Sequence, residues 1–190
     1  MKHFGLVGYP LGHSFSKNYF SEFFLRENIC DCTYENFAIE NIKLIKQVIS
    51  DPELCGFNVT IPYKQHIIPY LDCLSPEAEA IGAVNCVKIQ DGKLKGHNTD
   101  CYGFHVSLLD LIGDSRPSAL VLGSGGASKA VRYVLKQLGI ACTLVSRTPD
   151  AGSIGYDSID ENTMRRHCLI VNTTPQGMHP KTDTAPQIPY

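Results

Sequence analysis

The chain has 190 residues, of which 43% are hydrophobic and 19% charged, a composition typical of a globular protein with one or two domains. Its 17 basic and 19 acidic residues give a net charge of −2 without a block of either sign, which argues against a nucleic-acid-binding protein. The sequence lacks an apolar run of about 18 residues, the length that a membrane-spanning helix needs, so no membrane association is expected.

The N-terminal stretch and the cysteines bear on the cellular compartment. Gly8 and Pro10 come too early for the apolar part of a secretion signal, so we expect the first strand of a mature cytoplasmic protein. The cysteines include no C-x-x-C pair, and Cys30 and Cys32 are too closely spaced to act as a zinc-binding pair. We therefore expect no metal site, and reduced thiols that act as small, buried apolar residues.

Segments typical of strands and helices alternate along the first half of the chain. Apolar residues that alternate with polar ones predict strands, and apolar residues spaced three or four apart predict helices. The expected strands cover residues 4–9, 33–38, 56–61, 83–89 and 93–97. Asp91-Gly92 is a typical hairpin turn between the last two of these strands. The expected helices cover residues 20–24, 42–49 and 65–71, and a further helix opens near residues 98–100 and reaches residue 112.

The pattern changes after residues 113–117. Residues 119–122 are all apolar, as expected of a strand that is buried on both faces of a sheet. Apolar residues then recur at helical spacing through residues 127–138, and residues 143–145 and 169–171 are typical of further strands. Repeated strand–helix–strand units predict an α/β fold with largely parallel sheets. We place the domain boundary near residues 112–117, or slightly before them within the preceding helix, and divide the chain into domains of residues 1–112 and 113–190.

A cluster of glycines separates the buried strand from the amphipathic helix that follows it. It consists of Gly123, Ser124, Gly125, Gly126 and Ala127. Glycines at this point permit a tight turn and let backbone N–H groups approach a pyrophosphate at the helix N-terminus. The generic dinucleotide-binding pattern would place glycine or alanine at position 128, where this chain has serine. The alternative is a plain turn that uses glycine for backbone reasons, but the flanking strand and helix favour dinucleotide binding.

The end of the next strand indicates which dinucleotide is bound. An NAD-binding site would place an acidic residue here for the ribose 2′-hydroxyl, whereas this strand ends in Ser146-Arg147-Thr148 and the first carboxylate is Asp150. An arginine with neighbouring hydroxyls suits a 2′-phosphate, because a guanidinium matches its charge and shape. The sequence therefore predicts NADP, and the alternative is a surface arginine without a ligand.

Polar residues gather at the expected strand ends of the first half. They are Ser14, Ser16, Asn58, Thr60, Lys64, Asn85, Asn98, Thr99 and Asp100. In open α/β sheets this edge is where ligands bind, and hydroxyls with amides suit a polyhydroxylated substrate. Each residue also has a structural explanation: Ser16 and Asp100 could cap or charge helices, and Lys64 could be solvated. Their joint occurrence ahead of a nucleotide-binding unit favours a substrate site.

An ordered series of motifs along the chain resembles the shikimate dehydrogenase family. The matching pieces are GYPLGHSFSKNYF, GFNVTIPYK, AIGAVNCV, GHNTDCYGF, LGSGGASKAV, SRT and NTTPQGM, which together extend from Gly8 to Met178. The resemblance implies an N-terminal mixed α/β substrate domain, a Rossmann-like NADP-binding domain and an active-site cleft between them. It also implies an oxidoreductase of aromatic (chorismate) biosynthesis that reversibly reduces 3-dehydroshikimate to shikimate with NADPH. The partners implied are small molecules, for a monomer or homodimer.

The resemblance also implies roles for individual residues. Lys64 and Asp100 take the family's catalytic positions, where we expect Lys64 to act as acid and base and Asp100 to orient it. Ser14 and Ser16 would bind the substrate carboxylate. The other implied substrate-binding residues are Thr60, Asn85 and Asn98. The implied NADP-binding residues are Gly123, Ser124, Gly125, Gly126, Ala127, Ser146, Arg147, Thr148 and Met178. Asn58 is interpreted mainly as a residue that shapes the loop.

Several departures from the family leave alternatives open. Ser146 replaces an asparagine, and Ala151 falls where a second basic residue often assists with the 2′-phosphate, so NAD remains an alternative to NADP. A dehydrogenase that also accepts quinate is the second alternative. The sequence stops at Tyr190, where relatives continue through a part that includes a substrate-contacting glutamine. A non-catalytic module that only binds a ligand or partner is therefore the third alternative.

Overall fold

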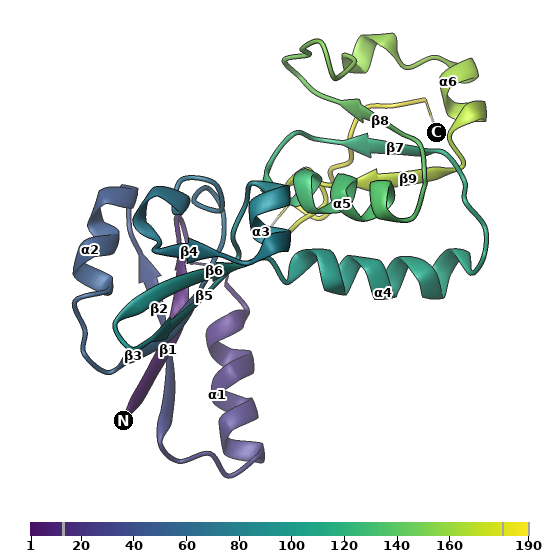
Figure 1. Ribbon diagram of the computed structural model, residues 1–190. Coiled ribbons are helices and arrows are strands. Elements are labelled where there is room, and N and C mark those ends of the chain that lie inside the picture. Colours follow the sequence, from purple (N-terminus) through teal and green to yellow (C-terminus); the bar gives the residue numbers. More distant parts are fainter. Residues whose placement is uncertain (13, 180, 190) are drawn as a thin grey trace. The chain divides into compact units, whose positions relative to one another are not determined.

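The computed structural model describes residues 1–12, 14–179 and 181–189. The chain divides into two compact units, residues 1–99 and 100–190 (Figure 1). Helix α4 (Asp100–Ile112), which the sequence-based division placed in the first domain, packs on α5 and is grouped with the second unit. Where the functional domain boundary lies stays a prediction.

In the described part of the first unit, six strands form one mixed sheet with the order β2-β1-β3-β5-β6-β4. Their bounds are β1 (Lys2–Gly8), β2 (Cys32–Ala38), β3 (Leu54–Val59), β4 (Cys73–Leu74), β5 (Cys86–Gln90) and β6 (Lys93–His97). β1 runs parallel to β2 and β3, whereas β5 runs antiparallel to both β3 and β6. The expected hairpin between β5 and β6 is confirmed, and both Asp91 and Gly92 have the positive φ that such a two-residue turn requires.

Helices and apolar loops cover both faces of this sheet. The elements are α1 (Ser16–Arg26), η1 (Ile42–Leu44), α2 (Ile45–Val48), η2 (Ile68–Tyr70) and α3 (Pro76–Ile81). Because successive side chains of a strand alternate between faces, Leu6 packs with residues of α1 while Val7 packs with Ile45 of α2. Two separate cores result, one beneath α1 and one on the opposite face.

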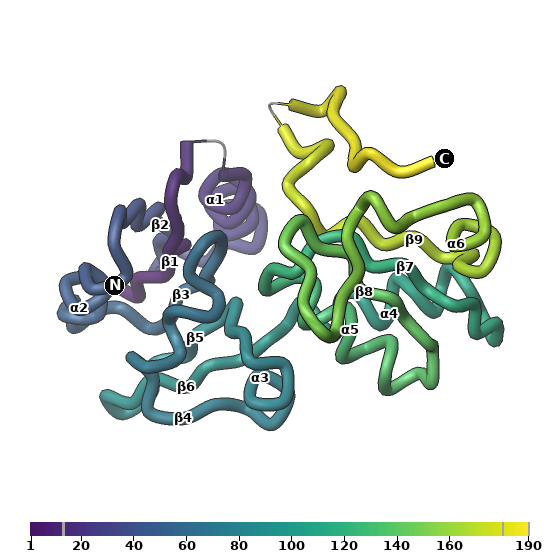
Figure 2. Tube along the Cα trace, turned by 90° about the horizontal axis from the view of Figure 1, so that it is seen from above, coloured from purple at the N-terminus to yellow at the C-terminus, as the bar shows by residue number. Residues whose placement is uncertain are grey.

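The second unit is built around a small parallel sheet with the order β8-β7-β9. The described elements are β7 (Ala119–Leu122), α5 (Gly126–Gln137), β8 (Cys142–Val145), η3 (Tyr156–Ser158), α6 (Glu161–Arg166) and β9 (Leu169–Asn172). Helices α4 and α5 lie side by side on one face of the sheet (Figure 2). Ile159 and Ile188 pack on the opposite face, so all four residues of β7 are buried as the apolar run predicted. The α/β fold with a Rossmann-like second half is therefore confirmed.

The differences from the expected elements have local physical reasons. The helix expected over residues 65–71 is only the short η2, because Pro69 supplies no backbone N–H to continue it. Two short helices were missed although their capping signals are present. Ser75 Oγ accepts a hydrogen bond from Ala78 N at the start of α3, and Asp160 Oδ1 accepts one from Thr163 N at the start of α6. Every helix in the described part of the chain is too short or too polar to span a membrane.

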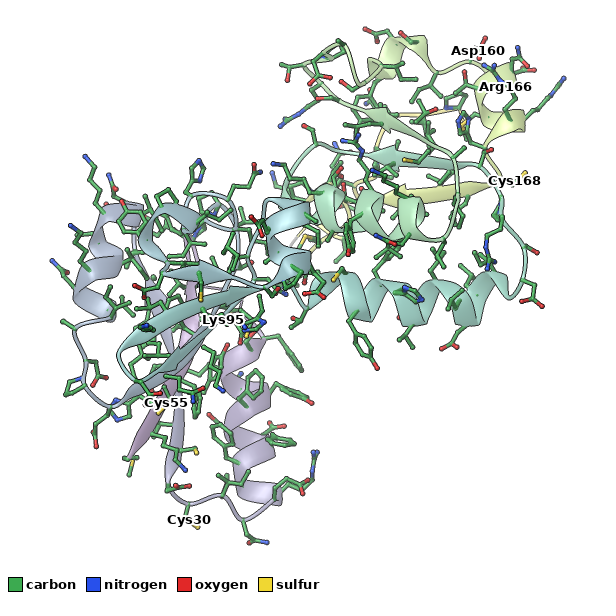
Figure 3. The ribbon with its side chains drawn as sticks, viewed as in Figure 1. Cys30, Cys55, Lys95, Asp160, Arg166 and Cys168 are labelled. Atoms are coloured by element: carbon green, nitrogen blue, oxygen red, sulfur yellow. The ribbon has the colours of Figure 1, made fainter. Side chains whose placement is uncertain are left out.

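The expectation that the cysteines are buried is wrong for most of them. All eight lie among the described residues as free thiols, and only Cys101 is buried. Cys30 and Cys168 lie at the surface (Figure 3), the first in a loop and the second immediately before β9. The reason is that these residues occupy loops and strand starts rather than strand centres. Within the described ranges, no group of three or more metal-ligating side chains comes together.

Candidate active site

The structure brings the predicted substrate residues to one edge of the first-unit sheet. The parallel strands β1 and β3 end at this edge, and the antiparallel pairings place the start of β5 and the end of β6 there as well. Ser14 and Ser16 follow β1, and Thr60 and Lys64 follow β3. Asn85 precedes β5 and Asn98 follows β6. Residues up to 84 positions apart in the sequence thus share one edge because of the mixed strand order.

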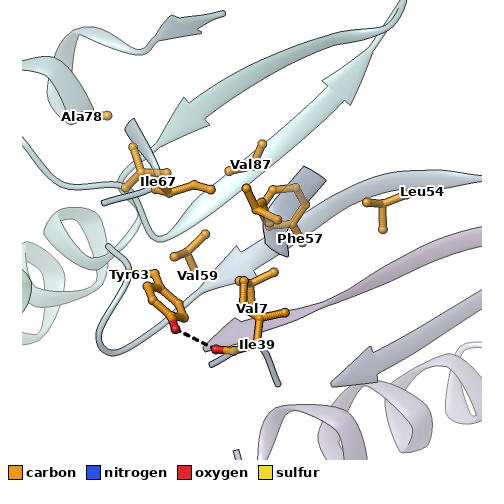
Figure 4. Close-up of a cluster of buried hydrophobic side chains, with 11 residues drawn as sticks. Val7, Ile39, Leu54, Phe57, Val59, Tyr63, Ile67, Ala78 and Val87 are labelled. Atoms are coloured by element: carbon orange, nitrogen blue, oxygen red, sulfur yellow. Dashed lines mark hydrogen bonds between the residues drawn. The ribbon is translucent and has the colours of Figure 1, made fainter. Parts of the chain in front are cut away.

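The backbone before Lys64 is held firmly to the sheet. Thr60 N donates to Val7 O at 2.9 Å, and Tyr63 N donates to Thr60 O at the same distance. The buried ring of Tyr63 enters the core, and its hydroxyl donates to Ile39 O at 2.7 Å (Figure 4). Lys64 O in turn accepts a hydrogen bond from Val84 N at 2.7 Å. The half-buried Lys64 side chain therefore starts from a backbone fixed on both sides.

Two buried amides join the neighbouring loops at the same edge. Asn85 Oδ1 accepts from Thr99 N at 2.8 Å, and Asn85 Nδ2 donates to Thr99 Oγ1 at 2.9 Å. Asn98 Nδ2 donates to Ala83 O at 3.0 Å. These bonds fix the segment that immediately precedes Asp100, the first residue of α4. The pairing of Asp100 with Lys64 stays a prediction.

The two serines lie at the start of α1, but neither caps it. The N-cap is Phe15, so the capping explanation for Ser16 is wrong, and Ser16 is instead the first helical residue. Ser14 Oγ accepts a hydrogen bond from Ser16 N at 3.3 Å, which orders the entry to the helix. Both serines are half-buried. Capping by the N-cap side chain therefore does not explain these two serines.

Asn58 lies within β3, inside the strand expected over residues 56–61, and its interpretation as a residue that shapes the loop stays a prediction. Its Oδ1 accepts a hydrogen bond from the hydroxyl of Tyr34 at 2.8 Å, and its Nδ2 donates to Asn85 O at 3.4 Å. Tyr34 was missed altogether, since it stands in β2 and reaches Asn58 across the intervening strand β1. A buried tyrosine within a strand gives no signal in the sequence of which polar group it will meet.

The glycine turn of the second unit has two parts with different requirements. Gly123 has a φ of +102°, and an added Cβ would lie 3.0 Å from Thr173 Oγ1, so the fold itself requires glycine. Gly125 has an ordinary φ of −78°, and a Cβ there would meet no described atom within 4 Å. No side chain of the described residues caps α5, which begins immediately after Gly125. An open glycine before uncapped N–H groups fits the approach of a pyrophosphate.

The loop after β8 contains a buried serine and an exposed arginine. Ser146 is buried, with its Oγ 3.3 Å from Ser124 Oγ, and it accepts from Thr148 N at 3.3 Å. Ser146 therefore joins this loop to the glycine turn, while Arg147 is exposed. The nearby Asp150 carboxylate is bound within its own turn, where hydrogen bonds from Ser153 Oγ and Gly152 N lower its pKa. At the strand end itself stands Arg147 rather than a carboxylate, which favours NADP.

The loop after β9 is tied to the glycine turn. Thr173 Oγ1 donates to Leu122 O at 2.6 Å, a contact that the sequence reading did not anticipate. Farther along the loop, Met178 is exposed, and its backbone forms hydrogen bonds with Pro175 O at 3.2 Å and Lys181 N at 2.9 Å. The predicted cofactor residues of this unit therefore come from three adjoining loops that follow β7, β8 and β9.

Replacement by alanine should affect stability at Gly123 and cofactor binding at Gly125. Gly123→Ala should destabilise the protein by about 1 kcal/mol or more, because alanine does not tolerate this positive φ. Gly125→Ala should leave the unfolding midpoint unchanged but raise the KM for NADPH about three- to tenfold, because its methyl group meets only the ligand. Urea denaturation and steady-state kinetics measure the two effects. A stable Gly125→Ala variant with an unchanged KM would show that the cofactor does not approach this turn.

Comparisons with known proteins agree with this geometry. Residues 6–87 match the family described as the shikimate dehydrogenase substrate binding domain. A shikimate dehydrogenase (NADP(+)) from Staphylococcus aureus is 40% identical over 186 residues, which cover 92% of this chain and 69% of the relative. Shikimate dehydrogenase 1 from Peptoclostridium difficile superposes with a TM-score of 0.84 at 34% identity, covering 98% of this chain and 72% of that one.

A third protein is known with ligands. The shikimate 5-dehydrogenase from Thermus thermophilus, solved in complex with NADP(H) and shikimate, superposes with a TM-score of 0.80 at 31% identity. That match covers 100% of this chain and 74% of the other. Similarity in sequence and in fold therefore extends over nearly the whole chain, across both compact units. The chain belongs to the shikimate dehydrogenase family.

Proposed function

We propose that the protein catalyses the reversible, NADPH-dependent reduction of 3-dehydroshikimate to shikimate in aromatic biosynthesis. The observation that carries the proposal is the gathering of hydroxyl, amide and ammonium groups at one edge of the first-unit sheet. They belong to Ser14, Ser16, Thr60, Lys64, Asn85 and Asn98. A small acid with several hydroxyls is the substrate class that such groups suit. The family and its ligand-bound relative from Thermus thermophilus support the same reaction.

In the proposed mechanism, each protein group has a defined task. When bound, NADPH would supply a hydride for the ketone carbon of the substrate, so that negative charge would develop on the ketone oxygen. Lys64 donates a proton to that oxygen and accepts it in the oxidative direction, while Asp100 orients the ammonium group. Ser14 and Ser16 bind the carboxylate of the substrate. Thr60, Asn85 and Asn98 hold its ring hydroxyls.

The second unit is proposed to bind NADP. The pyrophosphate would lie against the N-terminus of α5, where Gly125 leaves room, with Gly123, Ser124, Gly126 and Ala127 shaping the turn. Arg147, with Ser146 and Thr148 beside it, would hold the 2′-phosphate, and Met178 would approach the nicotinamide. A cytoplasmic monomer or homodimer completes the proposal.

One measurement tests the reaction directly. The purified protein is mixed with NADPH and 3-dehydroshikimate, and the loss of NADPH absorbance is followed, with production of NADPH from shikimate and NADP⁺ as the reverse assay. Turnover in both directions is expected. Binding of shikimate in a calorimeter without turnover in either assay would contradict the enzymatic proposal and support a non-catalytic binding module.

A further inference from the structure

A tyrosine hydroxyl is buried in the apolar layer between α1 and the first-unit sheet. Tyr34 is only 4% exposed and packs with Leu6 and Leu11. Its ring stacks on that of Phe20 with a centroid distance of 4.4 Å and an interplanar angle of 19°. Phenylalanine would fill the same space without burying a hydroxyl, and a buried hydroxyl is costly unless it is hydrogen-bonded. The hydroxyl therefore serves something other than packing.

The phenol oxygen connects two sides of the predicted substrate site. The hydroxyl donates a hydrogen bond to Asn58 Oδ1 at 2.8 Å, and Asn58 Nδ2 in turn donates one to the backbone oxygen of Asn85 at 3.4 Å. Burial raises the pKa of Tyr34 to about 12, and hydrogen bonding from Ser16 opposes part of this rise. Tyr34 is therefore a neutral donor at physiological pH, and it lies between the Ser16 hydroxyl and the side chain of Asn58.

The same tyrosine also fixes the start of α1. Ser16 and Phe20 are four residues apart in this helix, so they lie on one face, one turn from each other. The ring of Tyr34 contacts Phe20, and its hydroxyl is within reach of Ser16. Asn85, at the other end of the connection, is fixed in turn by the bonds of its side chain to Thr99. A continuous polar path thus runs from the first turn of α1 to the loop before α4.

We infer that Tyr34 is a positioning residue for substrate binding, whose hydroxyl holds Ser16 on one side and, through Asn58, the segment of Asn85 on the other. It touches neither substrate nor cofactor in this assignment. It fixes the separation between the serine that binds the carboxylate and the amide that binds the ring hydroxyls. The inference rests on the proposed function, because Ser16 and Asn85 matter to catalysis only if they bind the substrate.

The decisive variant is Tyr34→Phe, which keeps the ring contact with Phe20 and removes only the hydroxyl. The KM for shikimate should rise about three- to tenfold, the range expected for one lost hydrogen bond. The KM for NADP⁺ and kcat should stay within about twofold of the wild type, because the hydroxyl acts on substrate residues only. The Kd for shikimate, measured by calorimetry on the purified protein, should rise with the KM.

A matched control separates positioning from general stability. Thr163→Val also removes a buried hydroxyl, which donates to Asp160 Oδ1 at 2.7 Å, but it lies in α6 of the second unit, where no substrate residue is predicted. This variant should lose stability without a change in the KM for shikimate. A Tyr34→Phe variant that behaves in the same way would overturn the inference. If Tyr34→Phe does not fold, Asn58→Ala breaks the same path and should raise the same KM alone.

Ser16→Ala distinguishes failure of the inference from failure of the proposed function. It should raise the KM for shikimate, and adding Tyr34→Phe to it should raise the KM by a smaller factor than in the wild type, because the connection to Ser16 is already lost and only that to Asn58 remains. An active protein in which Ser16→Ala has no effect would refute the substrate role of Ser16. A clear effect of Ser16→Ala with none of Tyr34→Phe would refute the positioning role alone. Fully additive effects would also contradict the connection between the two residues.

Discussion

Replacing Lys64 by alanine is expected to lower kcat by about 10²- to 10⁴-fold, the usual contribution of a general acid or base. The KM for shikimate should change little, because the serines and amides that bind the substrate remain in place. The structure makes this test sharp, since the backbone of Lys64 is held by Val84 N and the adjacent Tyr63 is anchored in the core. Removal of the side chain should therefore leave the loop where it is. Single-turnover kinetics with NADPH and 3-dehydroshikimate would measure the chemical step.

Two further variants define what Lys64 contributes. Lys64→Arg keeps the positive charge, but a guanidinium does not give up its proton, so kcat should stay low if proton transfer is the task. Lys88→Ala removes an exposed lysine of β5 in the same sheet and should leave both kcat and KM unchanged. A kcat for Lys64→Ala close to that of Lys88→Ala would refute the catalytic assignment. Recovery of kcat by arginine would show that charge alone is needed.

Local sequence patterns predicted the central elements well, because those elements depend on their own residues. The apolar run of β7 and the helical spacing of α5 each specify one structure, and both formed at the expected residues within one position. The helices α3 and α6 were missed because they are only six residues long and have too few apolar positions for a clear period. Their N-caps, Ser75 and Asp160, were the available signals.

The candidate site could be predicted only where its residues lie next to strand ends. Thr60 and Lys64 could be placed at an edge because β3 ends just before them. The network of Tyr34, Asn58 and Asn85 could not, since it depends on which strands are neighbours and on their direction. The order of these strands along the chain is β1-β2-β3, whereas in the sheet β1 lies between β2 and β3. Local sequence patterns therefore miss residues such as Tyr34, which are proposed to act on the substrate only through another residue.

The glycine turn illustrates how the structure separates two explanations that the sequence left open. A plain turn accounts for Gly123, whose positive φ and close neighbour Thr173 leave no room for a side chain. It does not account for Gly125, where the backbone is ordinary and the space is open. The fold therefore explains Gly123, whereas binding of the cofactor at Gly125 stays a prediction. The part that the fold does not require is the part that we assign to the cofactor.

Replacing Arg147 by alanine should raise the KM for NADPH about 10- to 100-fold, the effect of losing charge-assisted hydrogen bonds to a phosphate. The KM for NADH should stay nearly constant, because NADH carries no 2′-phosphate. The geometry supports this outcome: Arg147 is exposed at the end of β8, while Ser146 is buried and holds the loop to the glycine turn. Steady-state kinetics with both cofactors gives the ratio of kcat/KM that reports the preference.

Arg166→Ala is the matched control, since it removes another arginine of the second unit, from the last turn of α6. It should change neither KM, whereas a general loss of positive charge would weaken NADPH binding in both variants. Because salt screens the interaction of an exposed guanidinium with a phosphate, the KM of the wild type for NADPH should also rise with ionic strength, and that of Arg147→Ala much less. Equal kcat/KM values for NADPH and NADH in the wild type would refute the role of Arg147. The Ser146 and Thr148 hydroxyls, which complement a ribose as readily as a phosphate, would then bind either cofactor without a preference.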